Sequence, residues 1–216
     1  MKYSRYLSNA MMFFVAMTCL ASREIDAQDK KPNINAIPAD IRMLIAPTDT
    51  LLAYKVFDLF GNGAMDAVIA VRHNARASAD NDQNPCDLII FQRKKGSLME
   101  MSRSSKAVDC TYNNIAKNAG ALALSENLKL GLNLVTYINQ QSVGSTQYTF
   151  SYSKERHAWY VSQLVDIYTQ NDEKTGMIDV VKESVRWPKD FSWTLMSNFD
   201  PDNFQDALDA HKNLVH

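Results

Sequence analysis

The sequence predicts a mainly β protein of the α+β class, built as antiparallel β-meander sheets with a short helix near each end. Two observations support this. Apolar and polar residues alternate in several stretches, such as Tyr148, Phe150 and Tyr152 against Thr149 and Ser151. This period of two is typical of strands with one buried face. Short clusters of Asp, Asn, Gly and Lys separate these stretches, as turns separate the strands of a meander.

The first expected elements lie on either side of an acidic turn. Residues 38–45 are expected to form a short helix with Pro38 in its first turn. The apolar runs 51–57 and 67–71 are expected to be strands, because they are rich in Val, Ile, Leu and Ala and are bounded by turn residues. Residues 58–66 join them.

Further elements follow from the same pattern. Residues 128–134 carry four leucines at alternate positions, which predicts one half-buried strand. The other expected strands lie at 86–92, 98–101, 148–152, 159–164 and 177–185, with turns at 93–96, 153–157 and 172–176. Residues 72–85 are expected to be an exposed loop, and 112–127 a loop followed by a strand or a short helix.

The C-terminal tail is expected to be a short amphipathic helix. Asp200 can cap it, and Pro201 fits its first position. Phe204, Leu208 and His211 are spaced three and four apart, as on one face of a helix.

The composition fits one folded domain. The chain has 216 residues, with 23 Lys and Arg against 24 Asp and Glu, so its net charge is -1. No basic face indicates nucleic acid, and no polybasic run indicates an anionic lipid surface. We therefore expect no nucleic-acid partner, and an unknown protein is the class of partner that remains open.

The N-terminus has the pattern of a secretory signal peptide. Lys2 and Arg5 give a positive start, and residues 10–21 form an apolar run too short to span a bilayer. Ala27 follows at a suitable distance, and cleavage after it is the preferred prediction. Cleavage after Ala21 is the alternative.

Export then sets the organisation and the compartment. Residues 1–27 are the expected signal peptide, 28–37 a flexible leader, and 38–216 a single β-rich domain in the periplasm or outside the cell. A lipid anchor on Cys19 and an uncleaved amphipathic start are alternatives. No other stretch of 18 or more apolar residues occurs, so no membrane span is expected in the mature chain.

Two cysteines, Cys86 and Cys110, remain after the expected cleavage. An even count in an oxidising compartment favours one disulfide between them. Two buried free thiols are the alternative. A metal pair is not favoured, because neither cysteine has another Cys or a His at ligand spacing.

The turn at residues 58–66 partly fits the calcium-loop pattern D-x-[DN]-x-[DN]-G. Asp58 occupies its first place, Asn62 its fifth and Gly63 its sixth. Phe60 occupies the third place and offers no side-chain oxygen. No Glu stands where an EF-hand would end, so the turn is not an EF-hand.

Two interpretations of this turn remain open. In the preferred one, Asp58 and Asp66 accept backbone N–H bonds and hold a hairpin. In the other, Asp58, Asn62 and Asp66 bind Ca²⁺, and the affinity is weak because Phe60 replaces a ligand. Calcium is the only cofactor that the sequence suggests.

The stretches 37–40 and 56–63 resemble bacterial secreted proteins that carry a single FG-GAP or VCBS-like "DLNGDG" hairpin. Further pieces follow in the order usual for that family: an apolar strand before a Gly turn, Ala-Val-Asp-Cys at 107–110, an aromatic hairpin, and Pro-Lys-Asp-Phe at 188–191. The resemblance implies an exported β-rich protein and no particular activity. Phe60 departs from the family pattern, which has Asn or Asp there.

No catalytic constellation is evident. The chain has four histidines, at positions 73, 157, 211 and 216, and none lies at metalloprotease spacing or beside a Gly-x-Ser-x-Gly elbow. The preferred hypothesis is a non-enzymatic periplasmic or secreted β-rich binding protein that presents loops or a sheet edge. The alternatives are an immunity-type inhibitor of a periplasm-acting toxin, and a hydrolase whose site is not visible in sequence.

Overall fold

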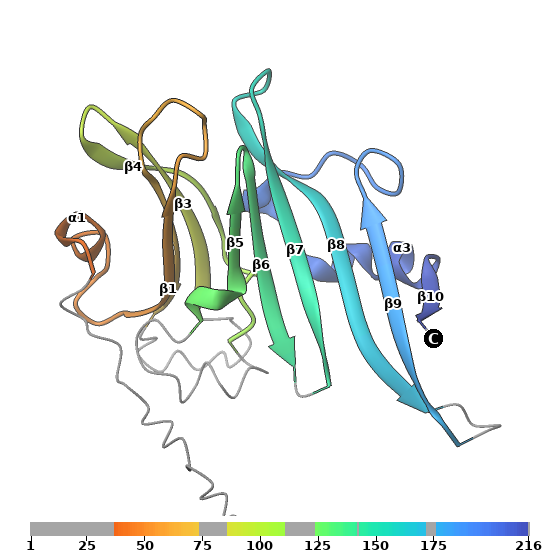
Figure 1. Ribbon diagram of the computed structural model, residues 1–216. Helices are drawn as coiled ribbons and strands as arrows, with labels where there is room; N and C mark the ends of the chain where they lie inside the picture. The colour runs from red at the N-terminus through yellow and green to blue at the C-terminus, as the bar shows by residue number, and fades with distance from the viewer. Residues whose placement is uncertain (1–36, 74–85, 111–123, 142, 172–175, 216) are drawn as a thin grey trace, which may run out of the picture. The chain divides into compact units, whose positions relative to one another are not determined.

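Two antiparallel sheets form most of the described part of the chain in this computed structural model (Figure 1). The structure describes residues 37–73, 86–110, 124–141, 143–171 and 176–215. They belong to one unit, Lys31–His216. The expected signal peptide, nearly all of the leader, most of the 72–85 loop, and much of 112–127 and 172–176 lie outside the described residues.

The first sheet has four strands in the order β1-β2-β3-β4. They are β1 (Thr50–Phe57), β2 (Asp66–Arg72), β3 (Cys86–Lys94) and β4 (Ser97–Ser104). The apolar run that forms β2 is buried on both faces, and so is most of β3. Ile41 of α1 (Ala39–Arg42) packs on one face with Ile69 and Ile89, and the second sheet packs on the other.

The second sheet has six strands in the order β10-β9-β8-β7-β6-β5. They are β5 (Leu128–Gly131), β6 (Leu134–Gln141), β7 (Gly144–Ser153), β8 (Ala158–Asn171), β9 (Ile178–Arg186) and β10 (Lys212–Val215). The alternation along β7 places Tyr148 and Phe150 in the core, while Thr149 and Ser151 face away from it.

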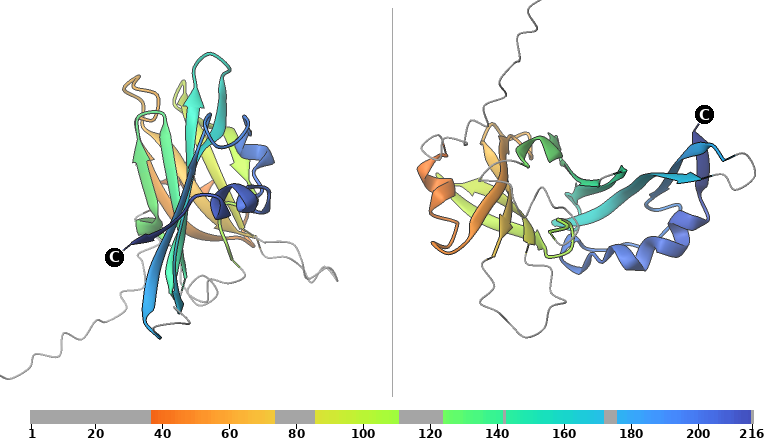
Figure 2. Two further views of the ribbon diagram at one scale, coloured as in Figure 1. Left: turned by 90° about the vertical axis from the view of Figure 1, so that its right-hand side faces the viewer. Right: turned by 90° about the horizontal axis from the view of Figure 1, so that it is seen from below.

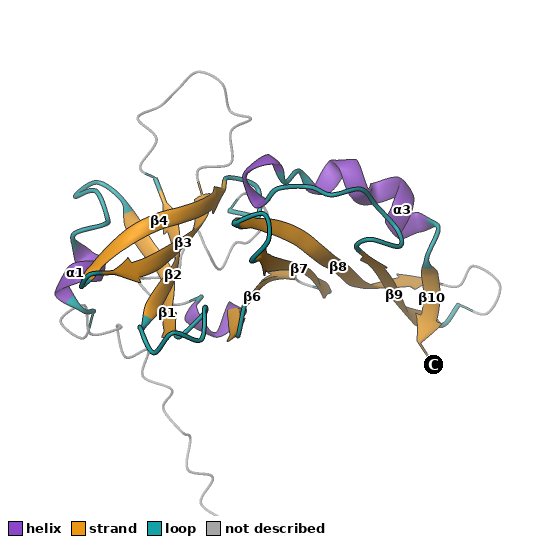
Figure 3. Ribbon diagram, turned by 90° about the horizontal axis from the view of Figure 1, so that it is seen from above, coloured by secondary structure: helices purple, strands orange, loops and turns teal. Residues whose placement is uncertain are grey.

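The helical segments after β9 lie on the inner face of the second sheet, over β8 and β9 (Figure 2 and Figure 3). They are η3 (Met196–Asn198), η4 (Pro201–Phe204) and α3 (Gln205–Asp209). Asp200 caps η4 as expected, because its carboxylate accepts the backbone N–H of Asp202. Phe204 and Leu208 are buried, so this tail closes the core.

The two sheets share one hydrophobic core. It contains Leu52 and Leu88 of the first sheet with Tyr137, Phe150 and Trp159 of the second. The short segment η2 (Ser125–Asn127) lies beside β1 and β6. The predicted fold class is confirmed: the protein is mainly β, with antiparallel meanders and a short helix toward each end.

The single strand predicted over residues 128–134 is wrong. Leu132 and Asn133 form a turn between β5 and β6, and Asn133 has φ 54°, a left-handed conformation that Asn tolerates. Its N–H donates to the Leu59 carbonyl at 2.6 Å, and its carbonyl accepts the Tyr152 N–H at 3.0 Å. The alternating leucines continue through the turn, but Leu132 is 60% exposed and does not belong to a buried face.

Two further differences concern strand ends. The turn expected at 93–96 contains only Lys95 and Gly96, so β3 and β4 are longer than predicted. The tail does not end as a helix, because Lys212–Val215 form β10 against β9. Among the described helices, none is long and apolar enough to cross a membrane.

Candidate binding site at the loop end of the sheets

Four described connections lie at the same end of the two sheets, at the top of Figure 1. They join β1 to β2, β3 to β4, β5 to β6 and β7 to β8. In an antiparallel meander every second turn lies at the same end of the sheet, so residues far apart in the sequence meet there. Residues 58–66 belong to this end.

Asp58 holds the loop by hydrogen bonds to its backbone. Its two carboxylate oxygens accept the N–H groups of Asn62 at 3.0 Å and Gly63 at 2.8 Å. The Asn62 side-chain oxygen accepts the Ala64 N–H at 2.9 Å. The bond from Gly63 is the main reason that the pKa of Asp58 is lowered. Gly61 and Gly63 take φ of 67° and 81°, which closes the turn without a Cβ clash.

Asp66 is fully buried at the start of β2 and connects three parts of the first sheet. It accepts the Leu59 N–H at 3.0 Å and the Arg93 N–H at 2.8 Å. Burial raises the pKa of Asp66. These bonds are the ones that the turn interpretation predicts.

Calcium binding by Asp58, Asn62 and Asp66 stays a prediction. All five of their side-chain oxygens already accept a backbone N–H. Within the described ranges, no group of three or more His, Cys, Asp and Glu is placed to hold a metal ion.

Phe60 has a packing role at the place where the calcium pattern requires a ligand. Its ring meets Tyr152 edge to face at 4.8 Å between centroids, and Trp159 at 6.0 Å. The loop of the first sheet is thereby anchored on aromatic side chains of the second. The departure from the calcium pattern therefore has a structural explanation.

A groove of about 420 Å³ lies next to this anchor. It is lined by residues of β4, the start of β8 and the segment around η3: Glu100, Met101, Ser102, Arg103, His157, Ala158, Trp159, Leu195 and Ser197. β4 is an edge strand of its sheet. The volume lies within the range of sites that hold small ligands or short peptide segments.

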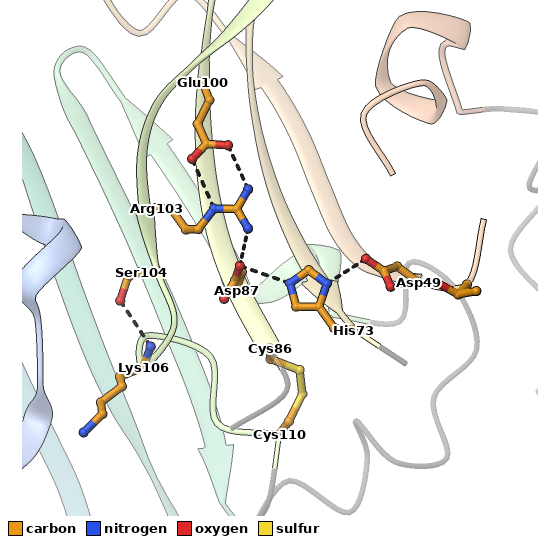
Figure 4. A network of polar contacts seen from close by, with 10 residues as sticks. Asp49, His73, Cys86, Asp87, Glu100, Arg103, Ser104, Lys106 and Cys110 are labelled. Carbon is orange, nitrogen blue, oxygen red and sulfur yellow. Dashed lines mark hydrogen bonds and ion pairs between the residues drawn. A yellow bond between two sulfur atoms is a disulfide. The ribbon is translucent and has the colours of Figure 1, made fainter. Parts of the chain in front are cut away.

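A network of charged side chains runs from the rim of this groove across the first sheet (Figure 4). Arg103 pairs with Glu100 through Nη2 at 2.8 Å and with the buried Asp87 through Nη1 at 2.5 Å. His73 Nε2 contacts Asp87 at 3.0 Å, and His73 Nδ1 contacts Asp49 at 2.6 Å. This network therefore holds the Arg103 guanidinium in a fixed position.

Both nitrogens of His73 are bonded to carboxylates. Burial disfavours its charge, but the hydrogen bonds to Asp87 and Asp49 outweigh burial and raise the pKa of His73. In a Ser-His-Asp triad one nitrogen must face the nucleophile. Here both nitrogens face acids, so this arrangement favours charge stabilisation over proton transfer to a nucleophile.

The other described histidines, His157 and His211, do not take part in this network of charged side chains. His157 has φ 49° in the β7–β8 turn and lines the groove. His211 donates from Nδ1 to the Ala207 carbonyl at 2.9 Å and contacts Asp190 at 3.2 Å.

The predicted disulfide between Cys86 and Cys110 is present, with 5.9 Å between the Cα atoms. It connects the start of β3 to the segment after β4. The buried Asn139 of β6 holds this segment from the other side, because its amide donates to the Ala107 carbonyl and accepts the Asp109 N–H, both at 2.9 Å. The disulfide and Asn139 together join the two sheets.

No sequence pattern predicts the groove or the network of charged side chains. Asp49, His73, Asp87 and Arg103 come from four separate stretches, and each alone has the pattern of a solvated turn or strand end. Only the pairing of β1, β2, β3 and β4 brings them together. Comparison with protein-family models finds no match for this chain, and no curated protein matches it either.

Proposed function

We propose that the protein is an exported, non-enzymatic binding protein, and that the groove beside β4 is where it holds its partner. The observation that carries this proposal is the groove, where an edge strand and a second sheet meet beside a fixed arginine. The partner is a protein segment with an apolar side chain. The half-buried Met101 and Leu195 offer it apolar surface, and Ser102 and Ser197 offer hydroxyl groups.

The rim of the groove is held in place before binding. Arg103 is bonded to Glu100 on one side and Asp87 on the other, and Phe60 packs on Trp159. A site that is already ordered loses less conformational entropy when a partner binds. This supports binding by the groove in its present conformation.

The hydrolase alternative has less support. It needs a base next to a nucleophile, and the His73 nitrogens are bonded to two acids. An immunity-type inhibitor is one form of the proposed binding function. It is distinguished by the identity of the captured protein.

Export itself is supported by the signal pattern and by the Cys86–Cys110 disulfide, which is typical of oxidising compartments. N-terminal sequencing of the protein recovered from the cell envelope should begin at Gln28 or Ser22. Full-length protein recovered from the cytosol would contradict export. The resemblance to FG-GAP-like secreted proteins stays a prediction.

A groove-filling variant tests the binding site. Ser197 is exposed and lines the groove, so Ser197→Trp should block it without disturbing the core. Ser97→Trp is the matched control, because Ser97 is also exposed, and it begins β4 outside the groove. Each variant is immobilised and exposed to an extract of the native cell envelope.

The proposal predicts that wild type and Ser97→Trp retain the same protein, identified by mass spectrometry, and that Ser197→Trp does not. Equal retention by all three would place binding outside the groove. Retention of no protein by wild type would contradict the binding function.

A further inference from the structure

The outer face of the second sheet is uncovered. The helical segments after β9 lie on the opposite face (Figure 3), and no described helix or strand packs on this one. The side chains on this face occupy the alternate, outward positions of β6 to β9, which are half-buried on β7 and mostly exposed on β9. They include Thr136, Thr149, Ser151, Gln163 and Ser184.

This outer face carries no carboxylate on its described strands. Asp166 of β8 and Asp179 and Glu183 of β9 fall on the positions that face α3, in phase with the buried residues Leu164 and Val181. Lys182 and Arg186 of β9 fall on the outer positions. The outer face is therefore positive, although the chain as a whole has a net charge of -1.

An aromatic cluster of Tyr160, Trp187 and Trp193 lies at one end of this face. Tyr160 and Trp193 stack at 4.1 Å between centroids, and Trp187 meets them edge to face at 5.1 and 5.4 Å. All three are half-buried. Their mutual packing fixes the cluster.

Two arginines border the aromatic cluster. The guanidinium of Arg156 lies 4.3 Å from the centroid of Trp193. With its amide oxygen turned toward Arg186, Gln163 accepts from both Nε and Nη2 of that arginine at 3.2 Å. Neither arginine forms an ion pair with a carboxylate of the described residues. Each is held in position and retains donors for an acidic group.

We infer that this face is a second docking surface, and that it binds an acidic segment of a protein. Trp, Tyr and Arg are the residues that contribute most to protein interfaces, and a ring of polar residues usually surrounds them. An ordered guanidinium forms paired bonds with a carboxylate. The inference rests on the proposed function only in taking the chain as a binding protein, because the surface is separate from the groove.

The geometry favours an acidic protein segment over a neutral glycan. A sugar that stacks on Trp193 needs a free ring face. Tyr160 and Arg156 both lie close to the centroid of that ring, and two groups at these distances cannot share one face. Both faces of Trp193 are therefore occupied, which leaves ring edges and guanidinium donors for a partner.

The test measures binding of fluorescently labelled poly-L-glutamate to the purified protein at physiological ionic strength. Arg156→Ala and Arg186→Ala should each weaken binding by about tenfold, as expected for central interface arginines. Arg156→Lys keeps the charge but loses the planar fork, so its loss should be smaller. Lys94→Ala, an exposed cation on the first sheet, is the matched control and should bind like wild type.

Other outcomes overturn the inference. No binding of poly-L-glutamate, or equal loss in Lys94→Ala, would show that the face is not an acidic-segment site. Binding of dextran sulfate or of phosphatidylserine vesicles without binding of poly-L-glutamate would assign the face to a glycan or a membrane. Ser197→Trp should leave poly-L-glutamate binding unchanged, so failure of the groove proposal and failure of this one are distinguishable.

Discussion

The ring of Phe60 meets the ring of Tyr152 edge to face, with 4.8 Å between the two centroids. Phe60 belongs to the β1–β2 loop of the first sheet, and Tyr152 lies one residue before the end of β7 in the second. A single side chain in an acidic turn thus links the two sheets beside the groove. The side chain that weakens the calcium pattern is the one that makes this link.

Phe60→Ala should therefore destabilise the fold. Removal of a half-buried ring that contacts Tyr152 and Trp159 should lower the unfolding free energy by about 2 kcal/mol, below the cost for a fully buried Phe. Urea denaturation measures the change. Phe57→Ala is the control, because Phe57 is 39% exposed and its removal should cost less. Equal losses in the two variants would contradict the role given to Phe60.

Asp66 and Asp58 should differ in their contribution to stability. Asp66→Ala leaves the buried N–H of Leu59 and the half-buried N–H of Arg93 without an acceptor, which should cost about 2 kcal/mol. Asp58→Ala frees two exposed N–H groups that water can satisfy, so its loss should be smaller. Thermal unfolding of both variants gives the order, and a larger loss for Asp58→Ala would contradict it.

Calcium separates the two interpretations of the same loop. A ligand that binds only the folded state raises its melting temperature. In the turn interpretation, millimolar calcium changes neither the wild type nor Asp58→Ala. A calcium-dependent rise in the wild type that disappears in Asp58→Ala would establish the metal site.

The sequence predicted most of this fold because hydrophobic alternation and turn residues are local signals. β1, β2, β3, β7 and β9 all lie where period two or an apolar run placed them. The β5–β6 turn was missed because its leucines keep the same alternation through Leu132 and Asn133. β10 was missed because the tail pattern fits a helix, and only pairing with β9 makes Lys212–Val215 a strand.

The candidate site was predictable only in part. The oxygens of Asp58 and Asp66 have the roles that a turn predicts. The groove could not be predicted, because it depends on Arg103, His157 and Ser197, which come from three distant elements. No local sequence pattern indicates that β4 lies beside η3.

The pH dependence of stability tests the network of charged side chains around His73. Asp87 and Asp49 raise the pKa of His73 above its ordinary value of about 6.5. Protonated His73 therefore stabilises the folded state; this contribution is complete below about pH 6.5 and is lost as the pH rises through the higher folded pKa. The unfolding free energy should fall over that window in wild type.

His73→Gln should flatten this part of the pH profile, because it removes the titrating group and keeps a polar side chain. Urea denaturation at a series of pH values measures it, and NMR titration of the His73 ring gives its pKa directly. The same slope in both proteins, or a pKa of His73 below about 6.5, would contradict the assignment.

The disulfide should contribute measurably to stability. Cys86 and Cys110 are separated by 24 residues, and closing a loop of that length should stabilise the fold by about 3 kcal/mol in the chain-entropy model. Reduction, or the pair Cys86→Ser and Cys110→Ser, should show this loss in urea. Thiol titration of the denatured, unreduced mature protein should find no free thiol, and two reactive thiols would refute the bond.

Site-specific photo-crosslinking from the groove tests the central claim most directly. A photoreactive amino acid is placed at Ser197, which lines the groove, and separately at Ser97, which lies outside it on β4. Irradiation of intact cells should join the Ser197 position to one discrete protein in the cell envelope and leave the Ser97 position unjoined. No adduct from Ser197, or the same adduct from both positions, would contradict the groove as the binding site.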